Sequence, residues 1–310
     1  MSTSIVEDFR SSKSSASTIE DVIGNTPLLR LARINYDLPP GVEVFAKAEY
    51  LNPGGSVKDR AALSMILHGE QSGKLRSGMT ILDATSGNTG IAYAMIGAAR
   101  GYRVKVCLPR NASPQRKQIL TSYGVEIIET DPLLSTDGSQ LIARELFASD
   151  PERYFYPDQY NNDANWQAHY HTTALEIWEQ TQKRVTHFIT GLGTSGTFVG
   201  VVRRLKELQP NLKAVSVQPD SPLHGLEGLK HMPSAMPPGI YDWTLADENV
   251  TVSTEDAQRT AKRLAREEGV LVGPSSGANV FAARRLALSL RGPAQVVTIL
   301  CDGGERYMSS

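Results

Sequence analysis

Short apolar runs rich in β-branched residues alternate with helix-like segments along most of the chain, and this alternation constrains the fold more than any other feature. The runs cover residues 42–46, 80–84, 103–108, 125–129, 187–190, 214–218 and 295–301, and each is typical of a buried strand. Helices are expected at 90–100, 114–123, 166–182, 196–208 and 254–268. Strand followed by helix, repeated, predicts an α/β fold with doubly wound, mostly parallel sheets.

The length of 310 residues allows two lobes with a cleft between them. A polar, Asn-rich stretch at 158–165 separates two patterned halves and marks a candidate boundary. We expect a smaller N-terminal α/β domain at 45–160 and a larger α/β domain built from 18–44 and 161–310. Residues 1–17 are Ser-rich and lack an apolar stretch, so we expect a mobile tail and neither a signal peptide nor a membrane span.

Composition excludes several function classes. Lys and Arg number 32 against 33 Asp and Glu, which leaves a net charge of -1 and no electrostatic basis for binding nucleic acid or an anionic membrane. A small-molecule partner is therefore expected.

Cys107 and Cys301 both lie in apolar runs, which favours reduced core thiols and a cytoplasmic protein. His169 and His171 form an H-x-H pair without a nearby third ligand, so no metal is expected and both are interpreted as structural.

The first of three glycine-containing loops, residues 52–60, places Lys58 at the opening of an apolar helical run that begins at Ala61. A partly desolvated amine beside a helix N-terminus is held nearer its neutral, nucleophilic form, and such a lysine can form a Schiff base. The alternative is a solvated surface lysine.

The second and third loops favour anions. Residues 85–90 combine hydroxyls, an amide and backbone N–H groups at a helix N-terminus, which favours a carboxylate or phosphate, although an ordinary helix cap is the alternative. Residues 191–197 match the spacing G-x-G-x-x-G between a strand and a helix. A dinucleotide site needs an acid at the end of the next strand, where this chain has Gln218. The hydroxyls of the third loop suit a single phosphate better.

These loops, in this order, resemble the cysteine synthase and cystathionine β-synthase family of fold-type II pyridoxal phosphate enzymes. The resemblance runs from about residue 23 to 307 and includes segments 23–28, 273–278 and 304–307. It implies that pyridoxal 5′-phosphate lies in the cleft between the two domains. Lys58 then corresponds to the Schiff-base lysine, Asn88 to the ligand of the cofactor's 3′ oxygen, and Ser275 to the partner of its pyridine nitrogen.

The same resemblance implies two further groups of residues. The phosphate cradle is formed by Gly193, Thr194, Ser195, Gly196 and Thr197, and the pocket for the substrate's α-carboxylate by Thr85, Ser86, Asn88, Thr89 and Gln159.

The function implied is that of a cysteine synthase, a transferase of cysteine biosynthesis. It replaces the activated side-chain group of O-acetylserine or O-phosphoserine by a sulfur nucleophile, with Lys58 acting also as the base on the α-proton. A serine facing the ring nitrogen, in place of a carboxylate, favours β-elimination over transamination. A cystathionine β-synthase using serine and homocysteine, and a non-catalytic binding relative, are the alternatives. Family members are usually homodimers, and the cleft could also bind the C-terminal peptide of a serine acyltransferase.

The segment at 219–241 departs from the family pattern. Its equivalent in relatives closes over the active site and contacts the leaving group or second substrate, but here the glycine-rich pattern of the acetylserine enzymes is missing. Phosphoserine-using relatives keep a cation in this region, so Lys230 or His231 could bind a phosphate leaving group. A solvated lysine on a surface turn is the alternative. The sequence leaves the leaving group and the sulfur donor open.

Overall fold

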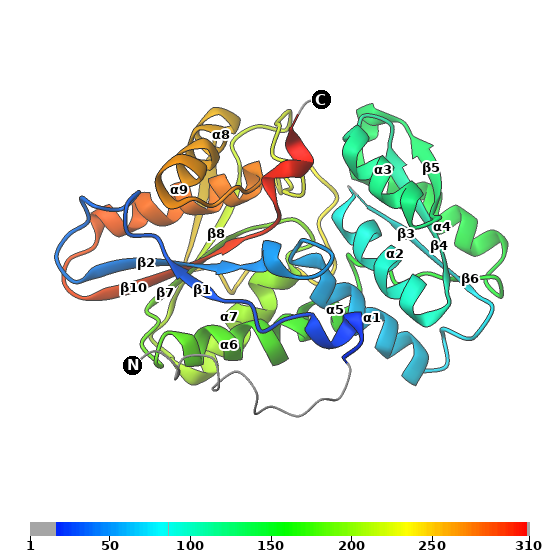
Figure 1. The fold of residues 1–310 in the computed structure, drawn as a ribbon, viewed down its shortest axis with the longest axis horizontal. Coiled ribbons are helices and arrows are strands. Elements are labelled where there is room, and N and C mark those ends of the chain that lie inside the picture. The colour runs from blue at the N-terminus through cyan, green and yellow to red at the C-terminus, as the bar shows by residue number, and fades with distance from the viewer. Residues whose placement is uncertain (1–16, 86, 309–310) are drawn as a thin grey trace, which may run out of the picture.

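The computed structural model describes residues 17–85 and 87–308, and its α/β fold contains two sheets in two lobes (Figure 1). The larger sheet has six strands in the order β1-β2-β10-β7-β8-β9. These strands are β1 (Leu28–Arg30), β2 (Val42–Ala48), β10 (Ala294–Leu300), β7 (His187–Gly191), β8 (Lys213–Pro219) and β9 (Glu248–Val252). All neighbours pair in parallel except β1 and β2, which are antiparallel.

The smaller sheet has four parallel strands in the order β5-β4-β3-β6. They are β5 (Glu126–Thr130), β4 (Arg103–Pro109), β3 (Thr80–Ala84) and β6 (Tyr154–Phe155). The helices of the described residues are α1 (Lys58–Gln71), α2 (Asn88–Arg100), α3 (Pro114–Ser122), α4 (Ser135–Ser149), α5 (Asp163–Ala168), α6 (Ala174–Gln180), α7 (Gly196–Leu208), α8 (Thr254–Arg263) and α9 (Pro274–Ser289).

Helices cover both faces of each sheet. Successive residues of a strand point to opposite faces, and in these strands the residues on both faces are apolar. In β7, Phe188 packs in the core formed with α6 and α7, whereas Ile189 packs in the core formed with α8 and α9. In β3, Ile81 packs with α1 and α2, and Leu82 packs against α4. Continuous apolar runs of this kind are typical of parallel strands buried on both faces. The predicted α/β class with mostly parallel, doubly wound sheets is confirmed.

The seven predicted strands are all present, and the structure adds three more. β1 and β6 are only three and two residues long, and β9 is polar and largely exposed, so none of them carries a strong pattern. The helix predicted at 166–182 is divided into α5, a π-helical turn at His169–Thr173, and α6. The helix predicted to begin at Ala61 begins at Lys58 instead.

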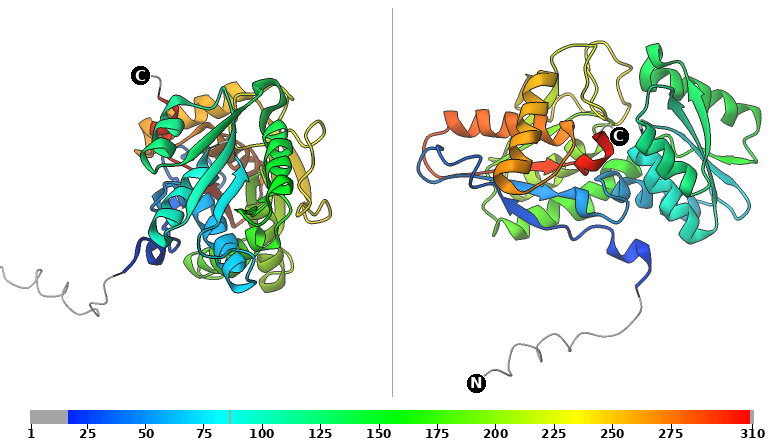
Figure 2. Two further views of the ribbon diagram at one scale, coloured as in Figure 1. Left: turned by 90° about the vertical axis from the view of Figure 1, so that its right-hand side faces the viewer. Right: turned by 45° about the horizontal axis from the view of Figure 1, so that its top comes forward.

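The chain passes between the lobes after β2 and again before α5. The domain limit expected at residue 45 falls inside β2, which pairs along its whole length with β10 in the larger sheet. Of the expected mobile tail at 1–17, residues 1–16 lie outside the described residues. Figure 2 shows the segment between β8 and β9, in yellow, reaching from the larger lobe toward the smaller one. None of the helices in 17–85 and 87–308 has the length and apolar character needed to span a bilayer.

Candidate active site

A cavity of about 450 Å³ lies between the two lobes, where loops leave the carboxyl ends of β3, β4, β7 and β8. Both lobes and the first helix contribute polar residues to its lining, among them Lys58, Thr89, Asp137, Gln159, Gly193, Thr194, Glu227, Lys230 and His231. A deeper hollow adjoins it and shares Lys58. This hollow is lined by Lys58, Asn88, Gly193, Thr194, Ser195, Gly196, Thr197 and Ser275, together with Cys301. The structure thus brings the residues expected around a cofactor to one place.

Lys58 is the first residue of α1, and the loop before it is fixed on both sides. The N–H of Val57 donates to the carbonyl of Cys301 at 2.8 Å, and the N–H of Gly54 donates to Asp59 Oδ2 at 2.6 Å. A Cβ at Gly54 would lie only 2.5 Å from Asp59 Oδ1, so glycine allows this fold-back. Lys58 is half-buried, and desolvation lowers the pKa of its amine. A lowered pKa increases the share of neutral, nucleophilic amine.

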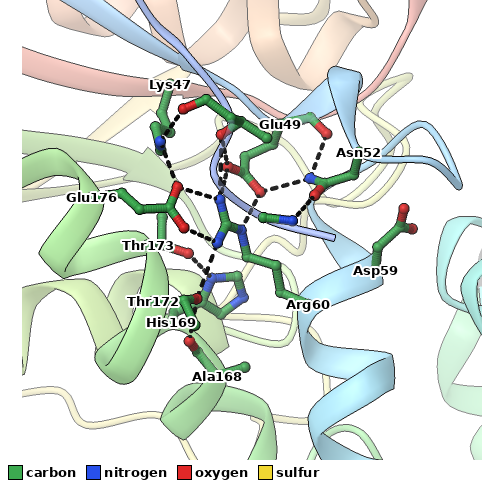
Figure 3. A network of polar contacts seen from close by, with 12 residues as sticks. Lys47, Glu49, Asn52, Asp59, Arg60, Ala168, His169, Thr172, Thr173 and Glu176 are labelled. Carbon is green, nitrogen blue, oxygen red and sulfur yellow. Dashed lines mark hydrogen bonds and ion pairs between the residues drawn. The ribbon is translucent and has the colours of Figure 1, made fainter. Parts of the chain in front are cut away.

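A buried ion-pair network holds the start of α1 against the larger lobe (Figure 3). Arg60 donates from Nε to Glu49 Oε2 at 2.7 Å and from Nη1 to Glu176 Oε1 at 2.6 Å. Lys47 reaches the other oxygen of Glu176 at 2.6 Å. Because Arg60 follows Lys58 by two positions, this network also positions the amine in the cavity.

The loop between β7 and α7 has the properties of a phosphate site. Ser195 adopts a left-handed conformation with φ of 69°, and its buried Oγ has no hydrogen-bond partner among the described residues. A Cβ at Gly196 would overlap the side chain of Asn165, and one at Gly193 would overlap the carbonyl of Gly228. The free hydroxyl and the N-terminus of a 13-residue helix therefore point to an anion in the hollow. This set of donors, beside a lysine amine, fits the phosphate end of pyridoxal phosphate.

Two residues outside the predicted site support this loop: Asn165, which the sequence did not single out, and His169, which was interpreted as structural. Asn165 donates from Nδ2 to Thr194 Oγ1 at 3.1 Å. His169 Nε2 lies 3.3 Å from Thr197 Oγ1, and its Nδ1 lies 2.9 Å from Thr173 Oγ1. Burial lowers the pKa of His169 to about 3, so the ring is neutral at physiological pH. His171 is exposed and does not share these contacts.

Three of the residues expected to bind the substrate's carboxylate form hydrogen bonds within the smaller lobe. Thr89 donates to Gln159 Oε1 at 2.8 Å, and Gln159 donates to the carbonyl of Ala84 at 2.5 Å. The hydroxyl oxygen of Thr85 accepts the N–H groups of Gly87 and Gly90 at 2.9 and 3.3 Å, which is the helix-cap alternative. Ser86 lies outside the described residues.

Asn88 is oriented by the C-terminal segment. Its Nδ2 donates to Asp302 Oδ2 at 2.7 Å, and its Oδ1 accepts from Arg306 Nη1 at 2.6 Å. Asp302 Oδ2 also accepts from the hydroxyl of Tyr307 at 2.7 Å. The amide orientation is therefore fixed, and one Nδ2 hydrogen remains for a ligand. Sequence reasoning missed Asp302 and Arg306 because a charged residue after a strand carries no local sign of its partner.

Lys230 and His231 both line the cavity, but each already has a partner. Lys230 Nζ lies 2.5 Å from Asp137 Oδ1, and His231 Nδ1 lies 2.7 Å from Ser234 Oγ. Lys230 is only 7% exposed, so the alternative of a solvated surface lysine is wrong. Asp137 was not singled out in the sequence, because its partner lies 93 residues away.

Comparison with known proteins identifies the family. A family model described as pyridoxal-phosphate dependent enzyme matches residues 19–302. Cysteine synthase of Aquifex aeolicus is 49% identical over 297 residues, with 94% of this chain and 91% of the relative covered. Cysteine synthase B of Salmonella typhimurium is 43% identical over 293 residues, with 94% and 95% covered.

Solved structures agree with these relatives. A hydrogen sulfide-producing enzyme of Fusobacterium nucleatum superposes with a TM-score of 0.90 at 37% identity, covering 95% of this chain and 100% of the other. An O-acetylserine dependent cystathionine β-synthase of Helicobacter pylori gives 0.89 at 35% identity, covering 96% and 99%. The resemblance read from the loops is thus confirmed. The chain belongs to the pyridoxal-phosphate dependent enzyme family, with pyridoxal phosphate as its cofactor.

Proposed function

We propose that this chain is a cysteine synthase, which replaces the activated side-chain group of an O-substituted serine by a sulfur nucleophile. The observation that carries the proposal is the Lys58 amine, whose pKa is lowered by desolvation and which lines both the deep hollow and the wider cavity. The sequence relatives described above are named cysteine synthases, which favours this reaction over cystathionine synthesis from serine and homocysteine.

In this proposal each group of residues has one task. Pyridoxal phosphate, when bound, supplies an electron sink for the negative charge that develops at the substrate's α-carbon. The amine of Lys58 would hold the cofactor and would accept the α-proton of the substrate. The amide of Asn88, held by Asp302 and Arg306, would donate to the cofactor's 3′ oxygen.

The remaining candidates bind the ends of the cofactor and the substrate. The phosphate is held by Gly193, Thr194, Ser195, Gly196 and Thr197, and the α-carboxylate by Thr85, Ser86, Asn88, Thr89 and Gln159. Ser275, in the first turn of α9, lines the hollow and would face the pyridine nitrogen. Lys230 and His231 line the wider cavity and would lie beside the departing group.

We also propose that the two lobes are separate domains and that the enzyme is a cytoplasmic homodimer. A serine acyltransferase C-terminal peptide is a further proposed ligand of the cavity. In support, Leu133 and Leu223 line the cavity while being 91% and 93% exposed, which suits a peptide with an apolar side chain. Light scattering of the purified protein tests the dimer, and titration with such a peptide tests the second ligand.

The decisive test is an assay of the purified holoenzyme. With O-acetylserine and sulfide it should form cysteine with a higher kcat/KM than it forms cystathionine from serine and homocysteine. Borohydride reduction followed by peptide mapping should place the cofactor on Lys58, and Lys58→Ala should bind cofactor without turnover. Absence of cysteine formation, or a label on another lysine, would overturn the proposal.

A further inference from the structure

An ion pair crosses the outer part of the cavity from one lobe to the other. Asp137 lies in the first turn of α4 in the smaller lobe, and Lys230 lies in the segment between β8 and β9 of the larger lobe. Asp137 Oδ1 and Lys230 Nζ are 2.5 Å apart. Both residues line the same cavity as Lys58 and Gln159.

Lys230 is fixed between the two regions expected to bind cofactor and substrate. Its N–H donates to the carbonyl of Leu192 at 2.8 Å, and Leu192 directly precedes the expected phosphate-binding residues 193–197. Its ammonium lies 5.0 Å from the centroid of the Tyr160 ring, and Tyr160 follows Gln159 in the chain. The side chain of Lys230 is only 7% exposed, and its ammonium group contacts Asp137 at the wall of the cavity.

Asp137 is held in place by more than Lys230. Its Oδ2 accepts the N–H of Met236 at 2.8 Å, and its Oδ1 also accepts from Gln140 Nε2 at 3.2 Å. These contacts, together with the ion pair, hold the carboxylate of Asp137 in one orientation. Separating the pair would leave one buried charge without compensation, which is strongly unfavourable.

We propose that Asp137 determines the leaving-group specificity of this enzyme by compensating the charge of Lys230. The cavity then accepts a neutral acyl ester such as O-acetylserine and disfavours the dianionic O-phosphoserine. A phosphate would have to take Lys230 from Asp137 and would then lie beside an uncovered carboxylate. The inference rests on the proposed cysteine synthase function, whose leaving group it specifies.

Both esters would undergo the same bond changes. The α-proton passes to Lys58, and the Cβ–O bond breaks with its electron pair on the departing oxygen. Hydrosulfide forms the new C–S bond, and a proton returns to Cα. The two reactions therefore differ in the charge of the departing group, which is acetate in one and phosphate in the other. A change in the enzyme's preference between the two esters reports on the charged residues around the departing group.

The experiment measures the ratio of kcat/KM for O-phosphoserine to kcat/KM for O-acetylserine at a fixed sulfide concentration. Asp137→Asn keeps the size of the side chain and frees the charge of Lys230. Asp137→Asn combined with Lys230→Met removes both charges. A second readout is the dissociation constant of each ester, obtained from the change in cofactor absorbance on binding.

Asp247→Asn is the matched control. Asp247 Oδ2 lies 3.0 Å from Lys206 Nζ and accepts the N–H of Ala214 at 2.8 Å, so it makes the same two kinds of contact as Asp137. Among the residues that the structure describes, Asp247 is not one of those that line the cavity. The control therefore separates loss of an ion pair in general from loss of this one.

A charge-assisted contact to phosphate gives a tenfold to hundredfold effect, so Asp137→Asn should raise the ratio by about that factor and tighten O-phosphoserine binding in parallel. The double variant should lose this gain, and Asp247→Asn should leave the ratio unchanged. An unchanged ratio in Asp137→Asn, or a wild-type preference for O-phosphoserine, would overturn the inference alone. A wild-type enzyme that forms cysteine from neither ester would overturn the proposed function and the inference with it.

Discussion

The chemistry of each side chain in this site depends on its hydrogen-bond and ion-pair partners. The sequence predicts which loops bind the cofactor, because glycines and hydroxyls in short loops after strands suit anions. It does not predict the hydrogen-bond partners of the side chains in those loops. Asn88 is oriented by Asp302 and Arg306, which lie more than two hundred positions away along the chain. Local pattern identifies a donor, whereas tertiary packing decides which group it faces.

Ser275 provides a test at the level of one residue. A serine hydroxyl does not keep a proton on the pyridine nitrogen, whereas a carboxylate would, and electron density in the cofactor would then be redistributed. Ser275→Asp should therefore lower kcat/KM for O-acetylserine by about a hundredfold, comparable to the loss of a preorganised catalytic contact, and Ser275→Ala should do less harm. Steady-state kinetics check this, with cofactor content measured by absorbance for each variant.

If Ser275→Asp retains the turnover of the unmodified enzyme, Ser275 does not face the nitrogen. If both variants lose their cofactor, the residue acts in binding and the proposed role is wrong as well.

At the scale of elements, α1 depends on charges that no local pattern reveals. Its first turn carries Lys58 and Arg60, and Arg60 is 4% exposed while pairing with Glu49 and Glu176. Burial alone would raise the pKa of Glu49, but the charge and hydrogen bonds of Arg60 outweigh it and hold the pKa below its usual value. The helix start is thus fixed through paired charges to Glu49, directly after β2, and to Glu176 of α6.

Arg60→Met should strongly destabilise the protein, because it leaves buried carboxylates without their cation. Removal of one partner from a buried pair costs about 3–5 kcal/mol. Arg76→Met is the matched control, since Arg76 pairs with Glu152 at 2.6 Å on the surface, with side chains 59% and 84% exposed. Such exposed pairs contribute about 0–1 kcal/mol. Urea denaturation gives both free energies of unfolding, and equal losses would show that the network does not anchor α1.

Across the whole molecule, the strand and helix pattern predicted most of both sheets but not how the lobes meet. Periodicity reports burial, so the seven apolar runs were recognised and the short or polar strands β1, β6 and β9 were missed. The contact between Asp137 and Lys230 spans 93 positions and depends on the docking of two lobes. Such a contact leaves no trace in the local spacing of either residue.

Asp83 links the stability of the whole fold to pH. It lies in β3, fully buried, and accepts the hydroxyl of Tyr93 at 2.8 Å. Burial raises its pKa to about 7. Between about pH 4 and 7 the unfolded chain releases the proton of this carboxyl while the folded chain keeps it, so its contribution to stability falls as pH rises through that window. Asp59, whose pKa burial also raises to about 7, acts in the same direction.

Asp83→Asn cannot titrate, so its stability relative to the unmodified protein should rise by up to about 1.4 kcal/mol per pH unit from about pH 4 to 7 and stay level above. The difference between the two proteins is the quantity to measure, because His169 contributes with the opposite sign. The pKa of its folded state is about 3, so its contribution grows as pH rises from there toward the value of the unfolded chain. Urea denaturation at intervals of pH gives the difference curve.

Tyr93→Phe tests whether the Tyr93 hydroxyl lowers the pKa of Asp83. The hydroxyl of Tyr93 stabilises the ionised carboxylate and so lowers the pKa of Asp83, in opposition to burial. Without that donor the pKa should move upward, and the upper end of the pH window should move with it. A difference curve for Asp83→Asn that is flat between pH 4 and 7 would mean that Asp83 is ionised in the folded protein throughout. A window left unmoved by Tyr93→Phe would mean that the Tyr93 hydroxyl does not lower the pKa of Asp83.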